Sequence, residues 1–472
     1  MRETRVDGRN PGADGGGILS VAIPRIVMAG TQSGVGKTSV TLGLVTLLRR
    51  RGLRVQTFKV GPDYLDPTHL AVASGRACYN LDGWMMGRAH VLVQFARATR
   101  DADVAVIEGV MGLFDGASPN SIAGSTAQIA TWLRAPVVLV VDTRGMARSV
   151  AALAQGFAEF DAGVRVAGVI ANRCGSERHA RWLAKSLRAA SQPPLLGAVA
   201  AGTLPELRSR HLGLVTAGGR TRRLCDQLVD ALAPVLSADA VLRAARSAPL
   251  LPIKIPDGNC AARRLRVGLA DDAAFHFYYA DNLEALARAG VEWVRFSPLR
   301  DRSLPEDLCG LYLGGGYPEE HAAALSANGA MLRAVRRFSG LVYAECGGLM
   351  YLSQGVVARD GKRHRMAGVL PCWTRMSERR QALGYVAVTL TRDSFFGKRG
   401  ETLRGHEFHY SELSGTPGWP TAYAVRRRQT SAVTREGFQR GNALASYVHL
   451  HWASRPRAVR RFVKLLEERC AR

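Results

Sequence analysis

The sequence predicts an α/β protein with two doubly wound parallel-sheet domains. In both halves of the chain, short runs of β-branched and aliphatic residues alternate with stretches of helical periodicity. Several runs, such as Val137–Val141, are apolar throughout, which is typical of strands that helices cover on both faces of a parallel sheet. The chain of 472 residues is too long for one hydrophobic core and suits two domains.

The predicted elements follow in chain order. In the first half we expect a helix over 39–51 and strands over 26–29, 55–60, 104–107, 137–141 and 166–170. In the second half we expect helices over 279–289 and before Phe338, and strands over 266–270, 291–296, 310–313, 341–344 and 445–448.

The chain divides into four predicted segments. Residues 1–23 are rich in Gly, Arg and Asp, which indicates a disordered leader. Residues 24–213 form the first domain. The pattern weakens over 214–263 into Gly-Gly and proline-rich stretches around one predicted helix at 221–236, which is typical of a domain connection. Residues 264–472 form the second domain.

The composition limits the classes of function. We find no apolar run long enough to span a membrane and no signal peptide, so we expect a cytoplasmic protein. The eight cysteines are scattered singly, so we expect neither a disulfide framework nor a structural zinc site. The net charge of +25 attracts polyanions, but no nucleic-acid-binding module accompanies it. We therefore predict no nucleic-acid function.

A glycine loop between the first strand and its helix predicts an ATP site. The backbone around Gly34 and Gly36 can cradle phosphates, Lys37 can reach the β- and γ-phosphates, and Thr38 can ligate Mg²⁺. The strict pattern has a glycine five residues before Gly36, whereas this chain has it six before, at Gly30. The strand, loop and helix around the motif still favour nucleotide binding over a structural turn.

Acidic side chains follow two further strands. Asp63 and Asp66 come after strand 55–60, while Glu108 and Asp115 come at and after the end of strand 104–107. Because the carboxyl ends of parallel strands meet at one edge of the sheet, we expect the four acids to converge on the phosphates. Each acid alone is also compatible with an ordinary turn.

A cysteine on a strand-to-helix elbow predicts a nucleophile. Strand 341–344 runs into Cys346, and the glycines Gly347 and Gly348 permit a tight bend and a close approach of substrate. The start of the following helix favours the thiolate form. The polar segment 404–411 is either substrate-binding or structural.

Backbone amides and histidines near other strand ends complete this second predicted site. Amides of the glycine-rich turns, at Gly315, Gly316 and Gly347, are candidates for an oxyanion hole. His449 and His451 follow the last predicted strand, are candidates for the base, and face the same side of an extended chain. The pattern predicts acyl-transfer chemistry on a thiol.

With both sites taken together, the chain resembles the cobyrinate a,c-diamide synthase family of corrinoid biosynthesis. The resemblance covers residues 24–456, and it rests on segments 30–38, 58–67, 80–82, 107–116, 314–319, 345–352, 405–411 and 448–452. It implies a dethiobiotin-synthetase-like P-loop domain joined to a class I glutamine amidotransferase domain of flavodoxin-like fold. The implied reaction is amidation of the a and c acetate carboxylates of cobyrinate through an acyl phosphate and channelled ammonia.

The resemblance also implies roles for single residues. Cys346 and His449 would release ammonia from glutamine, and His451 stands where related enzymes carry an acid that orients the base, which leaves the orienting group of His449 open. Independently of the resemblance, Asn172 follows strand 166–170, where it either contacts the adenine or only forms a turn. The other implied roles are Mg²⁺ binding by Thr38, Asp63 and Glu108, and contacts to the substrate carboxylate by Tyr64, Asp66 and Asp115.

Other functions remain compatible with the sequence. The same reaction on hydrogenobyrinate or nickel-sirohydrochlorin is one, and a P-loop regulatory ATPase or a binding protein with an inactive glutaminase half are others. The expected partners are the corrinoid polycarboxylate, glutamine and ATP, with Mg²⁺ as the cofactor. We expect no nucleic-acid or membrane partner, and a homodimer is the one protein assembly that we consider.

Overall fold

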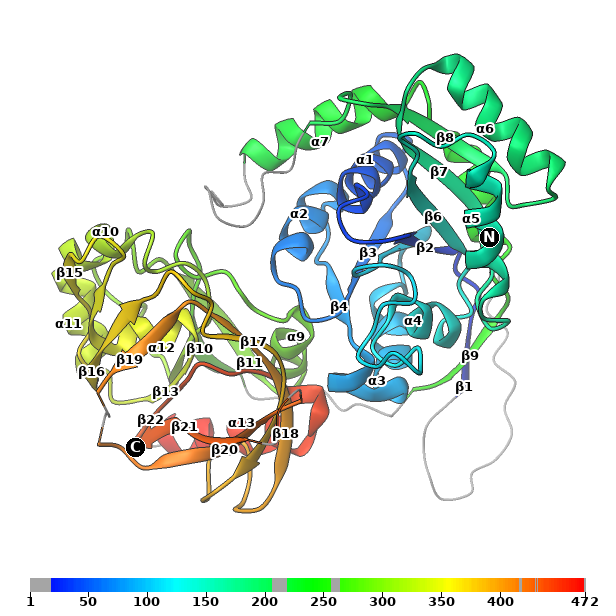
Figure 1. Cartoon of the computed structure of the whole chain (residues 1–472). Coiled ribbons are helices and arrows are strands. Elements are labelled where there is room, and N and C mark those ends of the chain that lie inside the picture. Colours follow the sequence, from blue (N-terminus) through cyan, green and yellow to red (C-terminus); the bar gives the residue numbers. More distant parts are fainter. Residues whose placement is uncertain are drawn as a thin grey trace.

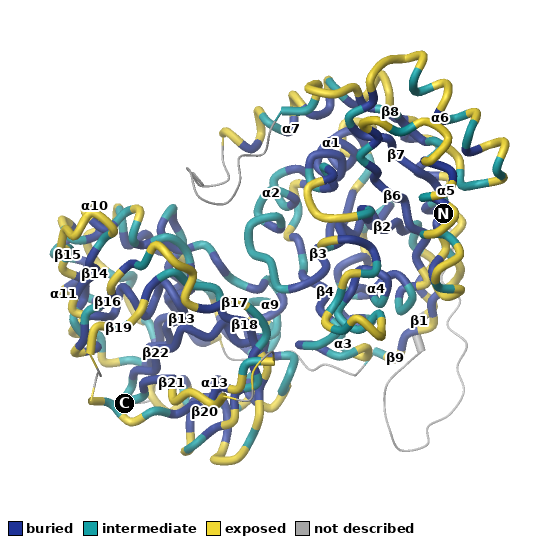
Figure 2. Tube along the Cα trace, in the orientation of Figure 1, coloured by how far each residue is buried: buried dark blue, intermediate teal, exposed yellow. Residues whose placement is uncertain are grey.

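The computed structural model describes residues 18–205, 219–255, 264–415, 418–428, 430 and 432–470. The chain forms two α/β halves, each built around its own large sheet (Figure 1). In Figure 2 the strands of both sheets are largely buried, whereas the outer helices such as α6 (Glu177–Ala189) are exposed along one side. The predicted two-domain α/β architecture is confirmed.

The first half contains a seven-stranded parallel sheet of order β4-β3-β5-β2-β6-β7-β8. The strands are β2 (Arg25–Gly30), β3 (Val55–Val60), β4 (Tyr79–Leu81), β5 (Val104–Glu108), β6 (Val137–Asp142), β7 (Val166–Cys174) and β8 (Leu195–Ala200). Every residue of β2, β3 and β5 is buried. Their apolar runs therefore pack against helices on both faces of the sheet.

The helices of the first half form two layers. One layer covers one face of the sheet and consists of α1 (Lys37–Arg50), α2 (Leu65–Ser74), α7 (Gly219–Leu232) and α8 (Ala238–Arg246). The other layer contains α3 (Gly83–Ala98), α4 (Thr126–Trp132), α5 (Ser149–Glu159) and α6. Such sheets bind ligands beside the carboxyl ends of their central strands.

The second half contains a ten-stranded mixed sheet. Its parallel part has the order β11-β10-β12-β13-β22, and an antiparallel part continues it as β21-β20-β17-β18-β23. The parallel strands are β10 (Leu265–Ala270), β11 (Val291–Phe296), β12 (Gly310–Leu313), β13 (Leu341–Glu345) and β22 (Ala443–Ser446). The others are β17 (Ala382–Leu390), β18 (Thr402–His409), β20 (Thr421–Arg427), β21 (Val433–Arg440) and β23 (His449–His451). The antiparallel extension is an addition to the predicted parallel sheet.

Helices and a small sheet cover this second sheet. One face packs with α10 (Ala322–Ala327), α11 (Gly329–Arg337) and α12 (Gly347–Leu352), and the other with α9 (Ala280–Arg288) and α13 (Arg457–Cys470). A 3-10 turn over Trp452–Ser454 precedes α13. The four-stranded small sheet consists of β14 (Ser353–Val357), β15 (Arg363–Arg365), β16 (Leu370–Met376) and β19 (Ser411–Ser414).

The structure corrects the predicted ends of the first domain. The prediction of a leader through residue 23 was wrong for β1 (Ile18–Val21), which pairs antiparallel with β9 (Leu251–Lys254). Much of the predicted connection is also folded, because α7 packs on α1 and α8 contributes Val241 to the same core. These segments are folded because they pair or pack with distant parts of the chain, which local periodicity in the sequence does not reveal. Residues 1–17 of the predicted leader lie outside the described residues, as do 206–218 and 256–263.

One disulfide contradicts the expectation that the cysteines are unpaired. Cys309, just before β12, is bonded to Cys470 at the end of α13, across a sequence separation of 161 residues. Packing of α13 against one face of the parallel sheet brings the two thiols together, so spacing in the sequence gave no sign of the pair. The described free cysteines are all buried: Cys78, Cys174, Cys225, Cys346 and Cys372.

The two halves contact each other through polar and aromatic side chains. Asp82 accepts a hydrogen bond of 2.6 Å from the hydroxyl of Tyr385 on β17. His90 on α3 lies 2.6 Å from Asp281 on α9, and Arg404 on β18 donates to the main-chain oxygen of Trp84 at 2.6 Å. These contacts hold α3 against α9 and β18. Within the described ranges, no helix combines the length and apolar character needed to cross a membrane.

Candidate active site

The phosphate loop lies between β2 and α1. Gly34 and Gly36 have φ values of 79° and 92°, a backbone region that glycine adopts without strain. A Cβ atom at Gly36 would lie 2.3 Å from Nδ2 of Asn172, so the loop also requires glycine for space. The helix begins directly at Lys37, which directs the amides of its first turn into the loop.

The side chain of Lys37 spans from the phosphate loop to the segment after β5. Its ammonium donates to the main-chain oxygen of Met111 at 2.5 Å and to that of Gln32 at 3.3 Å. Burial, with the nearby charge of Lys59, lowers the pKa of Lys37 below its ordinary value, and the surrounding carboxylates oppose this shift. The side chain therefore links the phosphate loop to the segment that carries Asp115.

The predicted acids converge on the same edge of the sheet. The hydroxyl of Thr38 donates to Glu108 at 2.6 Å, and Glu108 is fully buried at the end of β5. Asp66 lies at the start of α2, 2.6 Å from the ammonium of Lys59, while Asp63 accepts from the amide of Leu65. Three of the four acids thus surround the loop after β3 and the end of β5.

Lys59 is a member of this cluster that the sequence reading did not identify. It is 3% exposed in the middle of the acids and lies 2.9 Å from Glu108. Burial opposes its charge, but Asp66 and Glu108 outweigh burial and raise the pKa of Lys59. A lysine inside the predicted strand 55–60, in a sheet expected to be covered by helices, was the signal that could have revealed it.

The proton affinities of the acids differ because their neighbours differ. Burial alone would raise the pKa of Asp66, but Lys59 holds it at about 2. Burial and the adjacent charge of Asp66 raise the pKa of Asp63 to about 7. Burial raises the pKa of Glu108, with Lys59 acting in the opposite direction. Asp66 is therefore the firmly ionised carboxylate of the group.

The cluster fits a magnesium ion bound together with a nucleotide. Glu108 Oε2 is buried and makes no hydrogen bond within the described ranges, while its other oxygen contacts Thr38. Mg²⁺ at such sites takes one or two carboxylates and completes its shell with other oxygens, mainly from phosphates and water. No group of three or more His, Cys, Asp or Glu side chains in the described part of the chain forms a metal site by itself.

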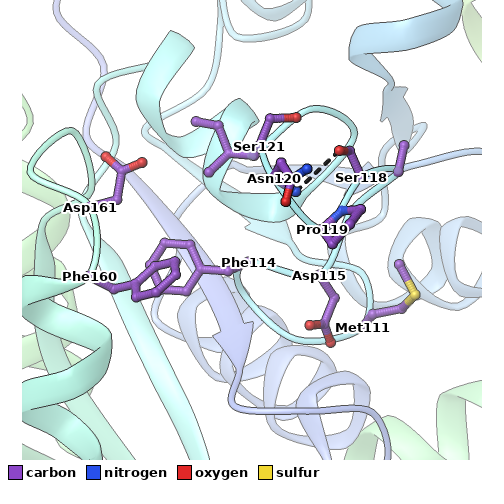
Figure 3. Close-up of a pocket in the computed structure, with 12 residues that line it drawn as sticks. Met111, Phe114, Asp115, Ser118, Pro119, Asn120, Ser121, Phe160 and Asp161 are labelled. Atoms are coloured by element: carbon purple, nitrogen blue, oxygen red, sulfur yellow. Dashed lines mark hydrogen bonds between the residues drawn. The ribbon is translucent and has the colours of Figure 1, made fainter.

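Asp115 lies beside a surface pocket of about 870 Å³ (Figure 3). Its carboxylate accepts from the amide of Gly112 at 2.8 Å, which fixes the loop after β5. Phe114 and Phe160 lie side by side in the pocket wall, with ring centroids 4.8 Å apart. Phe160 is 74% exposed and Met111 is 42% exposed, so the pocket presents an unusual apolar surface to solvent.

Asn172 lies beneath the phosphate loop. Its side-chain amide donates to the main-chain oxygen of Val35 at 2.8 Å, and it packs against Gly36. The neighbouring Arg173 donates to the main-chain oxygen of Gly34 at 3.0 Å. Both residues brace the loop from β7, and the contact of Asn172 with adenine stays a prediction.

Cys346 lies on the predicted elbow between β13 and α12. Its φ of 49° and ψ of −102° form a backbone conformation that is strained for any residue except glycine. Such strain holds a nucleophile at the turn, as in other strand-to-helix elbows. The residue is 7% exposed, and its thiol lies 3.8 Å from the main-chain oxygen of Phe408 on β18. Segment 404–411 therefore forms one wall of this site.

The predicted oxyanion glycines lie next to the elbow. A Cβ atom at Gly316 would lie 2.0 Å from the main-chain oxygen of Ala274, and one at Gly347 would lie 3.1 Å from the amide nitrogen of Gly316. A Cβ atom at Gly315 would lie 2.5 Å from Cε1 of His449. The three glycines therefore let the two turns and the histidine approach closely, and their oxyanion role stays a prediction.

His449 is buried between the two halves of the chain. Its Nδ1 lies 3.6 Å from Glu345, and its ring lies 4.9 Å from the ring of Tyr64 in the first half. Burial would lower the pKa of His449, but the Cys346 thiolate and Glu345 raise it to about 10. His449 therefore interacts with both Cys346 and Glu345, an arrangement that suits a base beside a thiol nucleophile.

His451 occupies a separate environment. It lies 3.8 Å from Asp281 and packs against Tyr279 at 4.8 Å between ring centroids. Burial lowers the pKa of His451 to about 4, which leaves its imidazole neutral. Of the two histidines that were candidates for the base, the one paired with Cys346 is His449.

The ring of Tyr64 contacts aromatic side chains of the second half of the chain. Its ring packs between the rings of Phe277 at 5.3 Å and Tyr279 at 4.5 Å, both from the second half. The neighbouring residues Asp63 and Asp66 belong to the acid cluster, so one short segment touches both sites. The sequence gave no indication of this bridging position.

Comparisons with known proteins cover both halves. A nucleotide-binding domain model described as CobQ/CobB/MinD/ParA matches residues 26–212, and a CobB/CobQ-like glutamine amidotransferase domain matches residues 266–457. The cobyrinate a,c-diamide synthase of Syntrophotalea carbinolica is 55% identical, over 94% of this chain and 98% of that protein. The Leptospira interrogans protein of the same name is 44% identical, over 94% of this chain and 99% of its own. The hydrogenobyrinate a,c-diamide synthase of Streptomyces coelicolor is 40% identical, over 95% of this chain and 98% of that protein. The chain therefore belongs to the cobyrinate a,c-diamide synthase family.

Proposed function

We propose that this chain catalyses the ATP- and glutamine-dependent amidation of the a and c acetate carboxylates of cobyrinate, giving cobyrinate a,c-diamide. The observation that carries the proposal is the joining of two sites in one chain: a phosphate loop with converging acids, and a Cys346–His449 pair. The names of similar proteins support the choice of substrate, because seven relatives are named cobyrinate a,c-diamide synthase.

In the first half, the proposed step is activation of a carboxylate. Lys37 and the loop amides hold the phosphates of ATP, and the substrate carboxylate oxygen attacks the γ-phosphorus while ADP leaves. Mg²⁺, held by Thr38, Glu108 and Asp63, would offset the charge of the phosphates when bound. The resulting acyl phosphate has a leaving group that ammonia can displace, releasing inorganic phosphate.

In the second half, the proposed step is release of ammonia. The Cys346 thiolate attacks the side-chain carbonyl of glutamine, and amides near Gly315, Gly316 and Gly347 stabilise the oxyanion. His449 gives its proton to the departing nitrogen as the carbon–nitrogen bond breaks. Water then hydrolyses the thioester to glutamate and restores the thiol.

The pocket beside Asp115 is the proposed position of the macrocycle. Its apolar wall of Phe114, Phe160 and Met111 suits a flat hydrophobic ring, and Lys37 contacts the main chain of Met111 at its edge. A carboxylate arm of a ring bound there would extend toward the phosphate loop. Asp66 and Asp115, which the sequence analysis assigns to the substrate carboxylate, would orient this arm.

Tyr64 is the proposed link between the two reactions. Its ring contacts His449, while its chain neighbours Asp63 and Asp66 belong to the ligase site. Ammonia released beside His449 would pass along this aromatic contact to the acyl phosphate. A closed path matters because ammonia that escapes into water at neutral pH is mostly protonated and no longer nucleophilic.

The substrate is tested by offering the purified chain each tetrapyrrole with Mg²⁺, ATP and glutamine. We expect cobyrinate to gain two amides with the highest kcat/KM, with hydrogenobyrinate and nickel-sirohydrochlorin as the compared substrates. Mass spectrometry of the products, together with the yield of glutamate and ADP, provides the measurement. A clear preference for the metal-free or the nickel macrocycle would overturn the choice of cobyrinate while leaving the ligase chemistry in place.

A further inference from the structure

We infer that Glu345, the residue directly before the nucleophile, orients His449 and stabilises its charged form. Glu345 is thus a positioning residue that replaces the acid expected at the position of His451. The inference rests on the proposed glutaminase step, because it concerns the group that sets the direction and the charge of the imidazole in that step.

The first support is the position of the carboxylate. Glu345 Oε2 lies 3.6 Å from His449 Nδ1, and the two side chains are 1% and 2% exposed. Nδ1 is buried and makes no hydrogen bond in the described part of the chain. A shift of a few tenths of an ångström would close a charge-assisted hydrogen bond between them. The opposite nitrogen, Nε2, lies on the side of Gly315.

The second support is that other groups hold Glu345 in place. The hydroxyl of Tyr312 on β12 donates to Oε2 at 3.0 Å, and the hydroxyl of Tyr343 on β13 donates to Oε1. The main-chain amide of Leu450, the residue after His449, donates to Oε1 at 3.1 Å. The carboxylate is therefore fixed from three strands, and one of them is the strand that carries the histidine.

The third support is electrostatic. A buried ionised carboxylate is costly unless a positive group compensates it, and neutral hydroxyls and an amide supply only partial compensation. The imidazolium of His449 is the cation in direct reach of Glu345. Titratable groups that face His449 from the surrounding elements are Glu345, Cys346, Tyr64, Glu407 and His409.

His451 does not perform this role. It lies beside Asp281 and Tyr279, and neither of its ring nitrogens makes a hydrogen bond within the described ranges. The position two residues after the base is thus occupied by a neutral imidazole in a separate buried contact. The carboxylate instead reaches His449 from the end of strand β13, which does not pair with the strand of the histidine.

Glu345→Gln tests the inference with little change in size. We expect kcat for glutamine hydrolysis to fall about 100-fold, because an amide neither stabilises the imidazolium nor selects its tautomer. The KM for glutamine and the rate of ammonia-dependent amidation should change little. Loss of the negative charge lowers the pKa of His449, so the alkaline limb of the kcat/KM profile should move to lower pH.

Two further variants show whether the effect comes from the charge of Glu345 in particular. Glu345→Asp keeps the charge, and we expect it to restore part of the activity and return the alkaline limb toward its original pH. Glu436→Gln is the matched control, because Glu436 is also a buried glutamate but bonds Ser446 and the amide of Tyr447. This control should leave the pH profile in place.

A second measurement is needed if Glu345→Gln loses activity because it does not fold correctly. The rate of alkylation of Cys346 by iodoacetamide, followed at that peptide as a function of pH, reports the thiolate–imidazolium pair without turnover. We expect the thiolate–imidazolium pair of Cys346 and His449 to be lost at a lower pH in Glu345→Gln than in the wild-type protein. Unchanged alkylation and glutaminase profiles would overturn the inference, whereas an original protein that forms no glutamate would overturn the proposed function.

Discussion

Cys346→Ala is expected to abolish glutamine-dependent amidation and to leave ammonia-dependent amidation near its original rate. The thiol is the proposed nucleophile of the glutaminase step, and without it the side-chain amide of glutamine is not cleaved. Free ammonia bypasses this step because the acyl phosphate forms in the other half of the chain. Amide formation with glutamine and with ammonium salt, measured in parallel with glutamate release, checks the prediction.

Cys372→Ala is the matched control for this experiment. Cys372 is a buried free cysteine of the same half, but it belongs to strand β16 and the neighbouring core. We expect the control to retain both activities, apart from a small loss of stability from the truncated side chain. Persistent glutamine-dependent amidation in Cys346→Ala would show that another group is the nucleophile.

Lys37→Ala is expected to remove amidation with either nitrogen source, with a loss of about 10³-fold or more. The ammonium of Lys37 lies at the phosphate loop and contacts Met111 at the edge of the pocket. Without it, the charge that develops on the transferred phosphoryl group is no longer stabilised. Release of ADP and phosphate in the presence of the tetrapyrrole provides the measurement.

Lys185→Ala provides the comparison, because Lys185 is an exposed lysine on helix α6 of the same half. This variant should have the original activity. Slow hydrolysis of glutamine should survive in Lys37→Ala, since Cys346 and His449 are unchanged. Amidation with ammonia at an undiminished rate in Lys37→Ala would argue against the acyl-phosphate step.

The parallel part of the fold was predictable, whereas the antiparallel part was not. Strands such as Val137–Asp142 are buried on both faces, so an unbroken apolar run marks them in the sequence. Strand β21 has the sequence VTREGFQR with three exposed residues at its start, so its apolar signal is weak. The pairing of β1 with β9 joins residues more than 200 positions apart, and periodicity cannot reveal it.

The site was predictable where its chemistry lies in a compact motif. The phosphate loop and the cysteine elbow have glycines at fixed spacing, and the backbone of Gly36 and Cys346 has the unusual conformations that such turns need. Lys59, Glu345 and Tyr64 were not identified in their present roles, since each depends on partners from distant strands. For Lys59 and Glu345 the remaining signal was a charged residue inside a predicted strand or directly after one.

The two halves are proposed to act as one enzyme in which ammonia released from glutamine at Cys346 passes directly to the acyl phosphate. The most direct test supplies glutamine labelled with the heavy nitrogen isotope in its side-chain amide, together with an excess of unlabelled ammonium. Closed transfer predicts that the new amides carry the label despite the excess. Tyr64→Ala, which opens the aromatic contact beside His449, should release labelled ammonia and dilute the label in the product. If the original protein gives amides with the isotope ratio of the bulk solution, nitrogen passes through water and the proposed coupling is wrong.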